Sequence, residues 1–226
     1  MNVLQQFSDI HSRIVLFATV YFLLLNLLAA ALFVWGELTL NDFVIALQLT
    51  LVQTFFGVIY LAYIANWKGV FLRYEDTNWF LAAIFAALGI LFQFVVLYYS
   101  ATVLPSVVLA FYSFLFVFVP FFAAFTENAF FIGVIADYFV DFFAAHFPRH
   151  VAIILGSIVG GLAAGLVSAL FHMGRYGPAE LIMVFFWFFW WSVASFLSGS
   201  TFYADFHHAI GNAAGFFRNV VEVIPA

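Results

Sequence analysis

The chain has 226 residues, of which 67% are hydrophobic and 8% are charged. Soluble globular domains contain about 45–50% apolar and about 25% charged residues, so this composition is typical of a membrane protein. The net charge of −5 excludes the basic surface that nucleic-acid binding requires. The absence of cysteine excludes disulfides, thiolate metal sites and thiol nucleophiles.

Six long apolar segments predict transmembrane helices, because a helix needs about 20 residues to cross a hydrocarbon core about 30 Å thick. We expect an all-α, polytopic transmembrane helix bundle with short loops, forming one integral-membrane domain over residues 1–226. Residues 198–226 are more polar, and we expect them to form an interfacial C-terminal segment. The predicted spans are residues 14–35, 43–65, 79–97, 103–125, 151–170 and 179–197.

Polar residues inside the second predicted span indicate contacts between helices. Gln48, Gln53 and Thr54 lie within this span, and in hydrocarbon such side chains usually face and bond neighbouring helices. Asn41 stands just before the span and is the expected N-cap.

Residues 127–149 form an ambiguous segment, which is either amphipathic or a seventh span. Its carboxylates Asp137 and Asp141 are four residues apart and therefore share one helical face. Lys and Arg prefer the cytoplasmic side of a membrane, and six spans separate these residues more strongly than seven. Because buried carboxylates often serve ion or proton pathways, we treat this pair as pathway candidates. The alternative is the polar face of an amphipathic helix.

His146 and His150 are candidate metal ligands, since residues four apart on one helix can bind the same ion. Pro148 lies between them and is expected to break that helix. The alternative is that both histidines mark the membrane surface where the next span begins.

The last two predicted spans carry signals for packing. Small residues that recur every four positions let helix backbones approach closely. Seven consecutive aromatic residues, 185–191, cover the whole circumference of the last span, so we expect its tryptophans to contact lipid or a partner subunit. The predicted helix-packing residues are Gly156, Gly160, Gly161, Ala164, Gly165 and Ser168, and the predicted lipid or partner contacts are Trp187, Trp190 and Trp191.

The order of several anchors resembles subunit III of cytochrome c oxidase. Two helices are followed by Trp67, Lys68 and Gly69 with Arg73 and Glu75 beyond, where that family has a Trp-Trp-Arg-Asp motif. His146 to Val151 then leads into a helix containing Gly156, and Glu180 introduces the aromatic last span. The resemblance implies a subunit without a redox metal that packs beside a catalytic subunit, binds phospholipid and supports proton uptake. The third predicted span lacks the buried glutamate of that family.

The sequence thus favours a non-catalytic integral-membrane subunit of a large energy-converting, respiratory-chain-like complex. Its expected partners are other membrane subunits and lipids, and no directly bound cofactor is expected apart from phospholipid. The expected location is the mitochondrial inner membrane or a bacterial plasma membrane. Two alternatives stay open: a small transporter or channel that uses Asp137 and Asp141, and a membrane-embedded metal enzyme. Enzymatic activity of the chain by itself is not expected.

Overall fold

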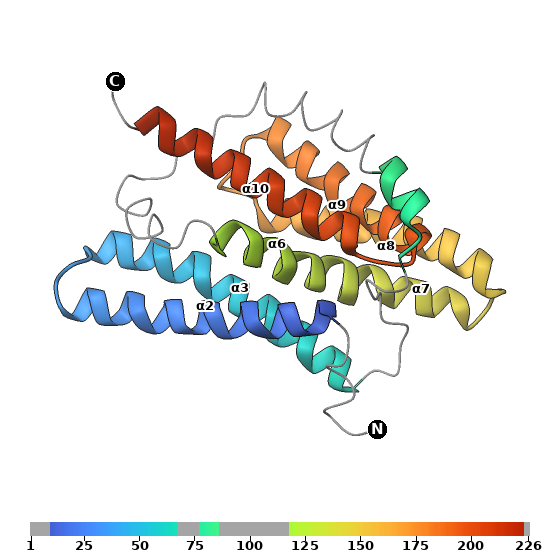
Figure 1. Ribbon diagram of the computed structural model, residues 1–226, viewed down its shortest axis with the longest axis horizontal. Helices are drawn as coiled ribbons and strands as arrows, with labels where there is room; N and C mark the ends of the chain where they lie inside the picture. Colours follow the sequence, from blue (N-terminus) through green and yellow to red (C-terminus); the bar gives the residue numbers. More distant parts are fainter. Residues whose placement is uncertain (1–9, 67–76, 86–117, 224–226) are drawn as a thin grey trace.

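The computed structural model describes residues 10–66, 77–85 and 118–223 (Figure 1). These residues form helices and no β-strand, so the predicted all-α class is confirmed for them. A further helical stretch covers residues 79–85. The main elements are α2 (Ile10–Val34), α3 (Leu40–Asn66), α6 (Phe118–Phe130), the π-helix η2 (Phe131–Ala136), α7 (Asp137–Ala144), α8 (Arg149–Phe171), α9 (Pro178–Ser198) and α10 (Phe202–Val223).

Within this described part, five helices are long and apolar enough to cross a membrane, which makes the chain a multi-pass integral membrane protein. The predicted spans 79–97 and 103–125 fall largely outside the described residues. The total of six spans therefore stays a prediction. The five helices are Ile10–Val34, Leu40–Tyr63, Phe118–Ala144, Arg149–Phe171 and Pro178–Ser198.

The predicted boundary between residues 103–125 and 127–149 is wrong, because α6, η2 and α7 follow one another without a break. Thr126, Glu127 and Asn128 interrupt the apolar sequence and were expected to end a span. Their side chains bond residues of neighbouring helices, so the helix continues through them. The former ambiguous segment is the second half of this long helix, not a separate seventh span or surface helix.

The α2–α3 hairpin forms one end of the molecule (Figure 1). Gly36 in its turn has φ +80°, a left-handed conformation that glycine adopts without steric cost. The Thr39 hydroxyl accepts a hydrogen bond from the Asp42 backbone N–H at 3.2 Å. Thr39 is therefore the N-cap of α3 in place of the predicted Asn41.

Helix α8 lies between the α6–α7 helix and α9, and its glycines face both neighbours. A Cβ on Gly160 would lie 2.6 Å from the Ala136 carbonyl oxygen, and one on Gly161 would lie 3.0 Å from that of Phe189. Gly156 meets Val140 and Gly165 meets Phe185 in the same way, while Ala164 and Ser168 are fully buried. These are the close backbone approaches that small residues at this spacing predict.

Helix α10 runs antiparallel along α6 instead of standing apart from the bundle (Figure 1). The Asn212 amide donates to the Pro120 carbonyl oxygen at 3.3 Å, and Asp205 and His208 are buried. The polar residues of the expected interfacial segment therefore face the interior of the protein along the first half of α10.

Candidate functional site

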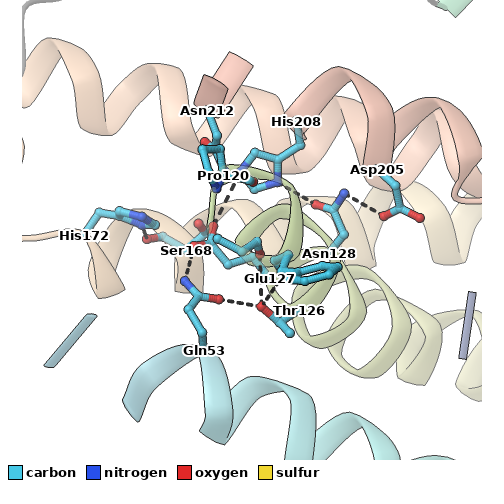
Figure 2. A network of polar contacts seen from close by, with 12 residues as sticks. Gln53, Pro120, Thr126, Glu127, Asn128, Ser168, His172, Asp205, His208 and Asn212 are labelled. Carbon is cyan, nitrogen blue, oxygen red and sulfur yellow. Dashed lines mark hydrogen bonds and ion pairs between the residues drawn. The ribbon is translucent and has the colours of Figure 1, made fainter. Parts of the chain in front are cut away.

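A chain of buried polar side chains connects α2, α3, α6 and α10 (Figure 2). We call His11, Glu127, Asn128, Asp205 and His208 the ionisable network. Its centre is the Asn128 amide, which is fully buried. Asn128 Nδ2 donates to Asp205 Oδ1 at 2.9 Å, and Asn128 Oδ1 lies 3.0 Å from His208 Nδ1. One amide therefore joins a carboxylate to an imidazole.

At one end of the network, Asp205 meets the first turn of α2. His11 Nε2 lies 3.2 Å from Asp205 Oδ2, and both side chains are almost completely buried. The other ring nitrogen of His11 lies 3.0 Å from the Tyr60 hydroxyl on α3. The carboxylate of α10 is thus connected to α3 through α2.

At the other end, Glu127 joins α6 to both α3 and α10. Gln53 Nε2 donates to Glu127 Oε1 at 2.6 Å, and Thr126 Oγ1 donates to Gln53 Oε1 at 2.6 Å. The second carboxylate oxygen, Oε2, lies 3.5 Å from His208 Nε2. Both oxygens of Glu127 therefore face side chains from other helices.

Aromatic rings and further titratable groups enclose this end of the network. The His208 ring stacks on Trp191 with centroids 4.4 Å apart, and the buried His172 at the end of α8 stacks on Tyr176 at 5.2 Å. Tyr176 lies in the α8–α9 turn, and burial raises the pKa of its phenol. The Tyr176 phenol therefore stays neutral beside Glu127.

Placing these groups inside an apolar bundle is costly. An ionised carboxylate at the centre of a bilayer costs at least about 2.5–3.5 kcal/mol. Removing charges from water costs several kcal/mol per ion, and close partners recover this only partly. Packing alone would not need carboxylates, because uncharged polar side chains also bond helices together.

A second polar group in the same bundle has no ionisable member. We call Asn26, Thr50 and Thr54 the neutral cluster. The Asn26 amide donates to Thr54 Oγ1 at 3.0 Å, and its carbonyl oxygen accepts the Thr50 hydroxyl hydrogen bond. This cluster joins α2 to α3. The prediction of contacts between helices is confirmed for Gln53 and Thr54, whereas Gln48 is exposed.

The predicted pathway candidates lie further along the same long helix. Asp137 is 5% exposed, and its Oδ2 accepts a hydrogen bond from the Tyr63 hydroxyl at 3.3 Å. Asp141 lies one turn later and is half-buried. Tyr63 and Tyr60 come from the same helix, α3, so this pair follows the ionisable network along one line of side chains.

The two predicted metal ligands are not gathered into a site. His146 lies at the end of α7, where Nδ1 is 2.8 Å from the Phe142 carbonyl oxygen, and His150 lies in the first turn of α8. Both side chains are exposed. Among the described residues, no three His, Asp or Glu side chains come together as metal ligands.

The expected exposure of the tryptophans on α9 is wrong for Trp191, which is 1% exposed. Its Nε1 donates to His207 Nδ1 at 2.8 Å, because α10 covers this face of α9. Trp187 and Trp190 are partly buried, and Trp190 Nε1 donates to the Tyr203 hydroxyl. The large side chains that α9 exposes include Phe186 and Ile182.

Comparison with protein-family models, with curated proteins and with solved structures finds no match to this chain. The functional argument therefore rests on the geometry of the ionisable network.

Proposed function

We propose that this chain is a membrane transport protein that moves protons or a small monovalent cation through its helix bundle. The observation that carries the proposal is the ionisable network itself. Two carboxylates and two imidazoles are connected through Asn128 in a bundle of apolar helices. Ionisable groups inside membrane spans are rare and typically mark ion paths or proton relays.

The length of the polar line on α3 supports transport across the membrane. Thr50, Gln53, Tyr60 and Tyr63 each bond a residue of α2 or α6. Tyr63 lies 13 residues after Thr50, which corresponds to about 20 Å of helix. This is about two thirds of a hydrocarbon core roughly 30 Å thick.

Reconstitution in liposomes tests the proposal. The purified protein should let protons enter when a potassium gradient with valinomycin makes the vesicle interior negative, and a pH-sensitive dye reports the entry. The Glu127→Gln variant keeps the size of the side chain but cannot ionise, and we expect it to lower the flux at least about tenfold, a loss of about 1.4 kcal/mol or more in barrier terms. Asp42→Asn is the matched control, because Asp42 is a buried carboxylate at the α2–α3 turn.

Flux at the level of empty vesicles for the wild-type protein would contradict transport by the chain alone. The second candidate function is a proton-conducting membrane subunit of a larger energy-converting complex. The near absence of described structure outside the helices and their turns favours this candidate. Its test is the native mass after gentle solubilisation, where a complex of much higher mass that contains redox cofactors supports the subunit role.

A further inference from the structure

The contact between Glu127 and His208 has a defined proton requirement that follows from its partners. An ionised carboxylate only accepts hydrogen bonds, whereas a side-chain amide has a donor end and an acceptor end. Asp205 accepts from Asn128 Nδ2, so the carbonyl oxygen of Asn128 points at His208. This orientation is assigned from the bonding partners, as is usual for amides.

The orientation of Asn128 fixes the proton on one nitrogen of His208. Because Asn128 Oδ1 accepts, His208 Nδ1 must carry the hydrogen of their 3.0 Å contact. A neutral imidazole with a proton on Nδ1 has only a lone pair on Nε2. That lone pair points at Glu127 Oε2, 3.5 Å away. Two lone pairs repel each other, so a proton is required between these atoms.

The other partners of the carboxylates favour a proton over a metal cation. Glu127 Oε1 accepts the Gln53 N–H, and the two oxygens of Asp205 face N–H groups of Asn128 and His11. Hard metal ions require several oxygen ligands that converge on one point. Here nitrogen donors point at the carboxylate oxygens, which leaves the Oε2–Nε2 contact for a proton.

We infer that Glu127 and His208 share one exchangeable proton between Oε2 and Nε2, and that Asn128 is the positioning residue that determines this. When the O–H bond of Glu127 breaks, the N–H bond at Nε2 forms, so a neutral pair becomes an ion pair without loss of a proton. The inference rests on the proposed function for the role of this proton in transport. It names the transported ion as H⁺.

Other titratable groups surround the pair from each packed element. His172 from α8 and His207 from α10 act electrostatically on His208, and Tyr176 from the α8–α9 turn acts on Glu127. Asp205 lies beyond Asn128. The side that α3 contributes is the uncharged amide of Gln53.

The direct test is the tautomer of His208 in the full-length protein, measured by nitrogen-15 NMR of histidine-labelled samples. The His208 signals are assigned by their loss in His208→Gln. We expect Nδ1 to be protonated in the wild-type protein, and in Glu127→Gln we expect a neutral ring whose Nε2 accepts from the new amide. A wild-type ring with its lone pair on Nδ1 would overturn the inference.

Variants of Asn128 separate positioning from packing. Asn128→Leu removes the acceptor, so we expect His208 to populate the tautomer with the proton on Nε2. Asn128→Ser retains a hydroxyl in case the leucine variant does not fold, and we expect it to release the tautomer in the same way. Asn212→Leu is the matched control, because that amide bonds a backbone carbonyl oxygen, and its His208 signals should be unchanged. Unchanged signals in both Asn128 variants would overturn the positioning role.

Flux and tautomer together distinguish the two proposals. The Nδ1-protonated ring without proton flux would sustain the shared proton and contradict transport. Proton flux with a lone pair on Nδ1 would sustain transport and contradict the shared-proton site.

Discussion

The neutral cluster and the ionisable network both bond helices together, yet they differ in the chemistry of their members. The neutral cluster joins α2 to α3 through an amide and two hydroxyls. The ionisable network joins α2, α3, α6 and α10 and contains two carboxylates and two imidazoles. Uncharged groups are sufficient to hold membrane helices together. The cost of burying ionisable groups therefore indicates a role in moving charge, in addition to packing.

Removal of one charged member should break the ionisable network with the largest effect on stability. Asp205→Leu leaves His11 and Asn128 without their acceptor, and loss of one partner of a buried pair costs about 3–5 kcal/mol. The free energy of unfolding in detergent measures this effect. The double variant His11→Leu/Asp205→Leu should recover part of the loss, because it removes the stranded imidazole as well. Equal losses in the single and double variants would contradict the pairing.

A packing variant sharpens the comparison from outside both polar groups. Gly160→Ala places a methyl group against the Ala136 carbonyl oxygen and should cost about 1–3 kcal/mol of stability. Gly215→Ala is the matched control, because no heavy atom from another part of the protein lies within 4 Å of its added Cβ. Thermal unfolding of the two variants measures the difference. If both variants unfold like the wild type, α8 does not pack as closely as described.

The smallest effect on stability is expected in the neutral cluster. Asn26→Leu removes the two hydrogen bonds to Thr50 and Thr54. Hydrogen bonds between membrane helices contribute about 0.6 kcal/mol on average and about 1.7 kcal/mol at most. We expect a loss in this range, measured by unfolding in detergent, and retained proton flux. A loss of flux equal to that of Glu127→Gln would mean that the two polar groups do not differ in role.

The apolar runs of the sequence predict most of the helices correctly, because length and hydropathy are local properties. The continuation of α6 through Glu127 was not predicted, since a run of three polar residues looks like a loop until its partners on other helices are known. Glu127 and Asn128 stand inside a long apolar stretch, and that signal could have identified them.

The assembly of the network could not be predicted in the same way. His11, Asn128 and Asp205 are far apart in the sequence, and only the packing of α10 along α6 brings them together. The same packing buries Trp191, because an aromatic run around a whole helix does not indicate which face another helix will cover. Tertiary packing thus decides both the site and the exposure of α9.

The most direct measurement is the potential-driven proton flux of Glu127→Gln and Asn26→Leu in the same liposome preparation, normalised to the amount of inserted protein. The ionisable network should carry the flux, so Glu127→Gln should fall at least about tenfold, while Asn26→Leu stays near the wild type. Wild-type flux in Glu127→Gln, or an equal loss in both variants, would contradict the assignment of transport to the ionisable network.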